Sequence, residues 1–316
     1  MITVAVPHQS IADALGEVGD DARVIVWDPS ASPVPPEERE RVTIACIPHL
    51  SGGRDVYERL ADCPDLRVIQ IPSAGYEHAL PFVPAGKKLA NARGVHDSRT
   101  AEMALTLALA SQRRLPQFLD AQRRETWEAD PYAPSLADRR CLVVGYGSIG
   151  SALGARLRAS EATVTGVART ARTAPDGTDV RAIEELPALL PDTEIVFLVT
   201  PLTEQTEGLV NAEFLAALPD DALVVNVGRG KVVDTDALLA ELASGRLRAA
   251  LDVTDPEPLP DGHPLWSAPG CIVVPHIAGF ALLTDKRYIA LLRRQIEAAR
   301  HGDDPVNFVA MGAFPA

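Results

Sequence analysis

The sequence predicts an α/β protein of two domains, each built on a parallel sheet. Short apolar runs rich in β-branched residues alternate with segments of helical periodicity along nearly the whole chain. Such alternation is typical of parallel strands joined by crossover helices. The length of 316 residues suits roughly two domains, and a hydrophobic content of 47% is enough for ordinary packed cores.

The first part of the chain alternates strands with helices. Apolar residues recur at helical spacing in segments such as 53–63, GRDVYERLADC. The strand candidates are ITVAV at 2–6, RVIVW at 23–27, VTIACI at 42–47 and LRVIQI at 66–71.

A helix and a long connection follow. Segment 98–114 carries apolar residues almost all round, which predicts a buried helix. Residues 115–140 mix charge and proline with Trp127 and Tyr132, and predict a long irregular connection. We interpret this connection as an arm that reaches over a neighbouring subunit, with a flexible linker as the alternative. Together, the helix and the arm predict a two-fold homodimer.

A second alternating set begins at Cys141, and a last helix is expected at 286–300. The strand candidates of this set are CLVVG at 141–145, TVTGV at 163–167, EIVFLVT at 194–200, ALVVNVG at 222–228, LRAALDV at 247–253 and CIVVPHI at 271–277.

The charge balance argues against a nucleic-acid or membrane-surface protein, because 43 acidic against 30 basic residues give a net charge of −13. No apolar run reaches the ~18 residues of a membrane helix. The start, MITVAVPHQS, predicts a strand rather than a signal peptide. The cysteines lie far apart without a CxxC pair, which predicts reduced core thiols in a cytoplasmic protein and no metal site; they are Cys46, Cys63, Cys141 and Cys271.

The stretch GYGSIG fits the GxGxxG pattern of a dinucleotide-binding loop through Gly145, Gly147 and Gly150. It lies between an apolar strand and a helical pattern, as a Rossmann-like domain requires. The three glycines permit a tight turn, close approach of a pyrophosphate, and close packing of helix on strand. Ser148 and Ile149 open the helix, whose N-terminus suits phosphates. A turn with a purely structural role is the alternative.

The segment VARTAR, at 167–172, indicates which nucleotide the loop holds. In NAD sites an acidic residue about 20 positions after the loop binds the ribose 2′-hydroxyl. Ala168 occupies that place here and is followed by Arg169, Thr170 and Arg172. A guanidinium binds a 2′-phosphate with two parallel hydrogen bonds, whereas a carboxylate repels it. The segment predicts NADP(H) in preference to NAD(H), and solvated surface arginines are the alternative.

Three segments each place one reactive side chain at the C-terminal end of a predicted strand, where ligands bind in open α/β sheets. These are VVNVGRG with Arg229, LDVTDPEPLP with Glu257, and IVVPHIAGF with His276. Histidine suits proton transfer near neutral pH, and a carboxylate favours its charged form. Arginine binds a substrate carboxylate and polarises a carbonyl. The set predicts reduction of a 2-oxo acid with hydride from the cofactor.

Over essentially its full length, the chain resembles the D-isomer-specific 2-hydroxyacid dehydrogenase family. This resemblance implies that Arg229 binds substrate, that His276 is the acid/base, and that Glu257 is the acid paired with it. Glu257 is chosen over Asp255 because the family acid immediately precedes the proline of EPL. The shared pieces, in family order, are VVGYGSIG, VTPLTEQTEGLVN, LVVNVGRGKVVDTDALLAEL, LDVTDPEPLPDGHPLW and VVPHIAG.

The resemblance also implies the domain plan: two Rossmann-like domains with parallel sheets and the active site in the cleft between them. A discontinuous, flavodoxin-like substrate-binding domain would comprise residues 1–97 plus 284–316. A dinucleotide-binding Rossmann domain would comprise residues 98–283.

Further positions carry over by resemblance. The backbone N–H groups of Ala74 and Gly75 are expected to hold the substrate carboxylate. Thr100 is expected near the nicotinamide, Asp252 at its carboxamide, and Gly279 close to the ring. The other residues expected to border the cofactor are Thr200, Pro201, Thr206, Val227 and Gly228.

Departures from the family pattern bear on specificity. Ala168 replaces the common Asp, which supports NADP, and Ser148 replaces an Arg that many members place in the loop. In PHLSGG, Leu50 and Ser51 resemble the glyoxylate and hydroxypyruvate reductases, whereas phosphoglycerate-type enzymes place Arg at the position of Leu50. Because an apolar Leu does not pair with a phosphate, small, unphosphorylated 2-oxo acids are favoured.

Two other functions fit the same fold. Some family members are dinucleotide-sensing co-repressors that act as scaffolds and retain the Arg–Glu–His set, and fold alone does not decide function. Other relatives oxidise formate or phosphite. Formate enzymes have Gln where Glu257 stands, which argues against that branch, whereas phosphite oxidation stays open.

Overall fold

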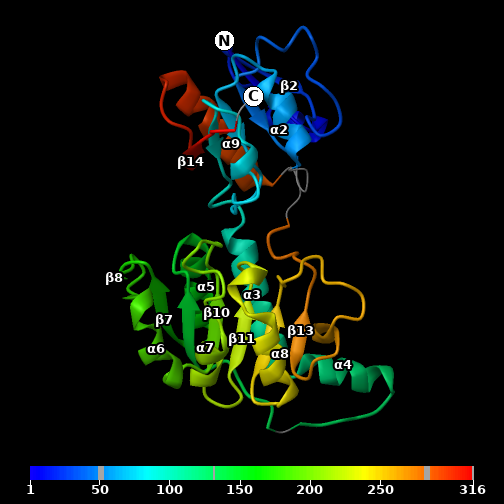
Figure 1. The fold of residues 1–316 in the computed structure, drawn as a ribbon, viewed down its shortest axis with the longest axis vertical. Coiled ribbons are helices and arrows are strands. Elements are labelled where there is room, and N and C mark those ends of the chain that lie inside the picture. Colours follow the sequence, from blue (N-terminus) through cyan, green and yellow to red (C-terminus); the bar gives the residue numbers. More distant parts are fainter. Residues whose placement is uncertain (49–52, 131, 281–284, 315–316) are drawn as a thin grey trace. The chain divides into compact units, whose positions relative to one another are not determined.

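The computed structural model describes residues 1–48, 53–130, 132–280 and 285–314. The chain divides into two compact units, Met1–His96 with Ala281–Ala316, and Asp97–Phe280. Each unit carries one mostly parallel sheet (Figure 1). The predicted α/β class with two parallel sheets is therefore confirmed.

The first unit has a six-stranded sheet in the order β14-β5-β4-β3-β1-β2, parallel except for β14. Val4 and Val6 of β1 face a cluster that includes Leu292 and Ile296, whereas Ala5 faces the opposite side, toward Leu60. This alternation follows from the two-residue period of a strand. The elements are β1 (Ile2–Val6), α1 (Gln9–Leu15), β2 (Ala22–Val26), β3 (Ile44–Cys46), α2 (Arg54–Ala61), β4 (Val68–Gln70), β5 (Lys88–Ala90), α9 (Lys286–His301) and β14 (Phe308–Met311).

The second unit has an eight-stranded sheet in the order β13-β12-β11-β10-β6-β7-β9-β8. Its central strands β6, β10 and β11 are buried on both faces, except for the first residue of β6, as continuous apolar runs predict. The strands are β6 (Arg140–Val144), β7 (Thr163–Ala168), β8 (Arg172–Thr173), β9 (Asp179–Ala182), β10 (Ile195–Leu198), β11 (Leu223–Asn226), β12 (Arg248–Leu251) and β13 (Cys271–Val273). The helices are α3 (Asp97–Gln112), α4 (Leu115–Arg123), α5 (Ser148–Ala159), α6 (Leu186–Leu189), α7 (Ala212–Ala217) and α8 (Thr235–Ala243).

Short 3₁₀ helices complete the two units, at Leu80–Phe82, Ile183–Glu185, Leu190–Asp192, Gly230–Val232 and Pro264–Trp266. No helix in the described ranges is long and apolar enough to span a membrane. All four cysteines are free thiols, and three of them are buried in the cores.

Two expectations about residues 98–140 need correction. α3 is buried along one face, which includes Ala101, Ala104 and Ala108, whereas Leu109 on another face is 36% exposed. The connection after it begins with α4 rather than with irregular chain. Pro116 stands in the first turn of α4, where a proline costs no hydrogen bond and presets φ. The prolines and charges of the segment therefore marked a helix start as well as a loop.

Candidate active site

The glycine loop joins β6 to α5, and its three glycines meet different demands. Gly145 has φ of 104°, and a Cβ there would lie 2.8 Å from backbone atoms of Val199 and Thr200. A Cβ at Gly150 would lie 2.5 Å from the carbonyl oxygen of Gly145. A Cβ at Gly147 would meet open space. Packing within the protein thus excludes side chains at Gly145 and Gly150, whereas the space at Gly147 is left for a ligand.

The start of α5 provides the groups that an anion needs. Among the described residues, no side chain caps this helix of 12 residues, and the first-turn N–H groups of Ser148, Ile149 and Gly150 have no carbonyl partner within the helix. The positive end of the helix dipole lies at the same place. Together these features suit a pyrophosphate, so the loop fits a dinucleotide.

The segment after β7 carries arginine where NAD sites carry an acid. β7 ends at Ala168, and the following Arg169 and Thr170 are exposed. Arg172, on β8, donates from Nη2 to the carbonyl of Tyr146 (2.6 Å) and from Nη1 to that of Thr170 (3.2 Å). Its guanidinium therefore lies beside the glycine loop, and these two bonds use two of its five N–H donors.

The segment that carries His276 is held by Asp252. β12 and β13 pair in parallel, with Leu251 opposite Val273, so both chain segments leave the sheet at one edge. His276 has φ of 52°, which is uncommon for a residue other than glycine. Its N–H donates to the Asp252 carbonyl (2.8 Å), and the N–H groups of Ile277 (2.8 Å) and Ala278 (3.1 Å) donate to the Asp252 carboxylate.

The ring of His276 is held by Glu257, through an ion pair between Nδ1 and Oε1. The hydrogen bond from this carboxylate raises the pKa of His276 above its usual value, although partial burial and the positive charge of Arg229 oppose the rise. The side chains of His276 and Glu257 are 46% and 38% exposed. In its charged form, this accessible imidazole has Nδ1 engaged by Glu257 and leaves Nε2 to donate a proton to a bound molecule.

Arg229 follows β11 in a turn that Asn226 holds. The Asn226 side chain is buried, donates to the Arg229 carbonyl (3.0 Å) and accepts from the N–H of Gly228 (3.0 Å). At Gly230, a Cβ would overlap the carbonyl of Thr254. Sequence reasoning missed Asn226, although an amide inside the apolar run LVVNVG was a signal.

The structure also gives the surroundings of the other expected cofactor residues. The Thr200 hydroxyl is buried without a hydrogen-bond partner in the described part of the chain, whereas the Thr206 hydroxyl donates to the Pro201 carbonyl (2.7 Å) and closes a turn. A Cβ at Gly228 would lie 2.8 Å from the Thr200 carbonyl oxygen, and one at Gly279 would meet open space. The buried members of the set are Thr100, Thr200, Thr206, Val227, Gly228 and Asp252.

In the first unit, the expected substrate loop follows β4. The Asn91 side chain donates to the Ala74 carbonyl (2.7 Å), and Ser73 Oγ donates to the Gly75 carbonyl (2.7 Å). Both carbonyls are thus tied within the unit. Among the described residues the N–H groups of Ala74 and Gly75 have no acceptor, so they can bind an anion. Leu50, the other residue assigned to substrate, lies outside the described residues.

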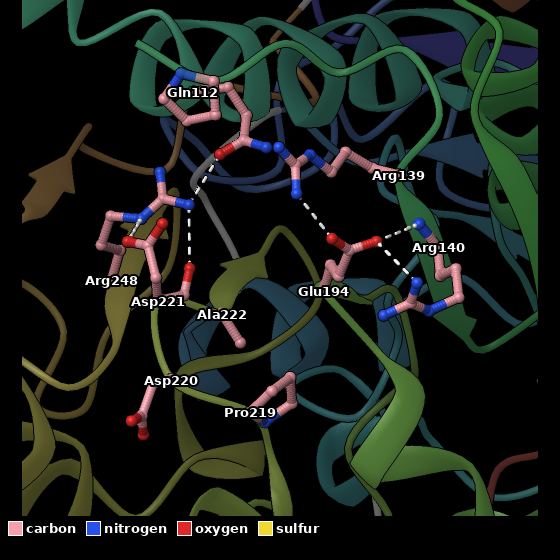
Figure 2. Close-up of a pocket in the computed structure, with 10 residues that line it drawn as sticks. Gln112, Arg139, Arg140, Glu194, Pro219, Asp220, Asp221, Ala222 and Arg248 are labelled. Atoms are coloured by element: carbon pink, nitrogen blue, oxygen red, sulfur yellow. Dashed lines mark hydrogen bonds and ion pairs between the residues drawn. The ribbon is translucent and has the colours of Figure 1, made fainter. Parts of the chain in front are cut away.

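A cavity of about 150 Å³ lies at the opposite, amino-terminal edge of the second sheet, beside the starts of β6, β10, β11 and β12 (Figure 2). Its charged walls are paired: Arg139 with Glu194 (2.6 Å) and Arg248 with Asp221 (2.8 Å). Arg248 also donates to Gln112 of α3 (2.7 Å). These contacts join α3 to the sheet. The candidate site lies at the other ends of the strands, their carboxyl ends.

Comparison with known proteins identifies relatives of the chain. The model of the D-isomer specific 2-hydroxyacid dehydrogenase NAD binding domain matches residues 105–278. The human protein named glyoxylate reductase/hydroxypyruvate reductase is 32% identical, covering 90% of this chain and 89% of that protein. The glyoxylate reductase of Thermofilum pendens is 31% identical, with 88% and 84% covered. A solved D-isomer specific 2-hydroxyacid dehydrogenase from Xanthobacter autotrophicus Py2, in complex with NADPH and MES, is similar with a TM-score of 0.78 at 30% identity and covers 98% of each chain.

Proposed function

Because the chain belongs to the D-isomer-specific 2-hydroxyacid dehydrogenase family, we propose that it reduces a small, unphosphorylated 2-oxo acid to the D-2-hydroxy acid with NADPH. Membership makes the protein an oxidoreductase that uses a nicotinamide dinucleotide. The observation that carries the proposal is the His276–Glu257 ion pair, since it favours a transferable proton on His276 at the carboxyl ends of the strands, where ligands bind.

The side chains divide the chemistry between them. Arg229 binds the substrate carboxylate and polarises the C2 carbonyl, and the N–H groups of Ala74 and Gly75 are assigned to substrate binding. His276 donates a proton from Nε2 to the carbonyl oxygen, and Glu257 stabilises the imidazolium through Nδ1. A bound nicotinamide supplies the hydride to C2. Residues 1–97 plus 284–316 are assigned to substrate binding and residues 98–283 to dinucleotide binding.

The preference for NADPH rests on Ala168, Arg169 and Arg172. No carboxylate stands at the end of β7 to repel a 2′-phosphate, and Arg172 lies against the glycine loop. Arg169 is exposed at the next position. The Xanthobacter relative contains NADPH, which supports the choice.

For the substrate we propose glyoxylate or hydroxypyruvate. The human and Thermofilum relatives carry these names, and Leu50 in the sequence replaces the arginine that suits a phosphorylated acid. A screen of glyoxylate, hydroxypyruvate, pyruvate and longer 2-oxo acids with NADPH and NADH tests this. We expect the highest kcat/KM for one of the two small acids with NADPH. The absence of turnover with every 2-oxo acid, or oxidation of phosphite with NADP⁺, would contradict the proposal.

We also propose a two-fold homodimer in the cytoplasm. Leu109 of α3, Leu115 and Leu119 of α4, and Trp127 are each at least 36% exposed, which is costly for large apolar side chains that stay in water. Light scattering at micromolar concentration should give twice the chain mass of 33.7 kDa. A monomer at that concentration would contradict the dimer.

A further inference from the structure

Tyr146, the second residue of the glycine loop, is buried between α5 and β7. Its side chain is 2% exposed and fills the space over two glycines. A Cβ at Gly166 would lie 2.7 Å from the ring, and one at Gly154 would overlap the hydroxyl. The two glycines therefore make room for a large residue that GxGxxG does not specify.

The Tyr146 hydroxyl binds the turn between β8 and β9. It donates to Asp176 Oδ2 (2.9 Å) and shares a hydrogen bond with Thr178 Oγ1 (2.8 Å). Arg158 of α5 donates to the same Asp176 oxygen (2.8 Å), as does Ser151 (3.2 Å). Burial raises the pKa of Asp176, but its hydrogen bonds hold that pKa well below the usual range, so the turn carries a charged anchor.

The carbonyl of Tyr146 binds the same hairpin at a second point, because it accepts from Arg172 Nη2 (2.6 Å). β8 is only two residues long, lies at the sheet edge and pairs with β9 through Arg172–Val180 and Thr173–Asp179. So short an edge strand has few ladder bonds of its own. Contacts from Tyr146, and from Arg158 and Ser151 of α5, add to these and hold the hairpin in position.

We propose that Tyr146 and Asp176 are positioning residues for cofactor choice. They hold the β8–β9 hairpin against the glycine loop, so that Arg172 stays where the 2′-phosphate of NADPH binds. A cofactor without that phosphate makes no use of this arrangement. The inference rests on the proposed preference for NADPH.

Calorimetry with two probes tests the inference without turnover: adenosine 2′,5′-bisphosphate, which carries the 2′-phosphate, and adenosine 5′-monophosphate, which lacks it. The variants are Tyr146→Phe and Asp176→Asn, with Arg172→Gln as the direct loss of the guanidinium. Glu185→Gln is the matched control, because it breaks the ion pair with Arg181 of β9 and leaves the glycine loop untouched. Binding of the monophosphate also reports that each variant is folded.

The wild type should bind the bisphosphate more tightly, and Arg172→Gln should remove much of that advantage. Tyr146→Phe and Asp176→Asn should each weaken bisphosphate binding by about 3- to 10-fold, since Phe cannot bond to Asp176 or Thr178 and Asn removes the charged acceptor of the turn. Monophosphate binding should stay within about twofold, and Glu185→Gln should change neither affinity.

The other outcomes separate the two proposals. Equal weakening of both probes in Tyr146→Phe would give the residue a general role in the loop and overturn the inference. No effect in Tyr146→Phe and Asp176→Asn, beside a clear effect in Arg172→Gln, would overturn the inference and leave the NADPH preference standing. Equal affinity of the wild type for both probes would overturn the preference itself, and the inference with it.

Discussion

His276 and Glu257 form an ion pair through Nδ1 and Oε1, on segments that leave the sheet beside each other. A second carboxylate, that of Asp252, accepts from the N–H groups of Ile277 and Ala278. The two acids therefore act on different parts of one segment. Asp252 supports the left-handed backbone at His276 through the next two residues, and Glu257 fixes the ring and favours its charged form. Loss of Glu257 should therefore lower the pKa of His276, while the segment that carries His276 keeps its conformation.

The first prediction follows from the sign of the pKa shift. The Glu257 carboxylate raises the pKa of His276, so the imidazolium persists to higher pH than in free histidine. Reduction needs this proton, and its kcat/KM should fall as the pH rises through the raised pKa. Glu257→Gln should move the fall to lower pH. Asp255→Asn is the control and should leave the pH profile unchanged. An unchanged profile in Glu257→Gln would remove Glu257 from its proposed role.

Replacement of His276 should separate catalysis from cofactor binding. His276→Gln should lower kcat for reduction by roughly 100- to 10,000-fold, which is the typical rate contribution of general acid catalysis. Binding of NADPH, followed by its fluorescence, should persist. Because φ at this position is 52°, His276→Asn is a useful second variant, since asparagine tolerates this conformation better. If either variant kept wild-type turnover, another group would be the acid.

Arg229→Lys should raise KM and lower kcat for the 2-oxo acid, because a point charge cannot reproduce the two-pronged contact of a guanidinium. Steady-state kinetics at one fixed pH measures both. Lys231→Arg, two positions on, is the control and should leave both values unchanged. Unaltered kinetics in Arg229→Lys would remove Arg229 from substrate binding.

Alanine at two glycines of the loop should have different effects: at Gly150 it should lower stability, and at Gly147 it should lower dinucleotide affinity. Gly150→Ala brings a Cβ to 2.5 Å from the Gly145 carbonyl oxygen, and such overpacking costs about 1–3 kcal/mol, which lowers Tm by several degrees. Gly147→Ala meets open space, so Tm should hold while dinucleotide affinity falls. Thermal unfolding and calorimetry measure the two effects. Equal Tm values for both variants would contradict the packing role of Gly150.

The central strands of the sheets were predictable because burial on both faces requires continuous apolar runs. Runs such as 141–145 and 222–228 contain β6 and β11. Four strands were missed: β5, β8, β9 and β14. β8 and β14 lie at sheet edges, and β5 and β9 have only three and four residues, too few for a clear apolar run. α4 was missed because its proline and charges are equally typical of a loop.

The candidate site was predictable where chemistry fixes residue type and spacing. Arg229, Glu257 and His276 each follow a recognisable strand, and the ion pair joins two of them. The supporting residues were not predictable in the same way. Asn226 and Tyr146 act through hydrogen bonds to segments distant in sequence or to backbone groups, and neither contact leaves a spacing pattern.

The last prediction concerns Ala168 and Arg169 at the end of β7. If Arg169 receives the 2′-phosphate with help from Arg172, kcat/KM should favour NADPH over NADH. One good charge-assisted hydrogen bond corresponds to about a 10- to 150-fold preference, and the exposed position of Arg169 together with salt screening points to the lower end. Ala168→Asp combined with Arg169→Ala should reverse the preference, because the new carboxylate accepts from a ribose hydroxyl and repels phosphate. The measurement is kcat/KM with both cofactors at one ionic strength, for the wild type and the double variant. Equal values or an NADH preference in the wild type would mean that these arginines are surface charges alone.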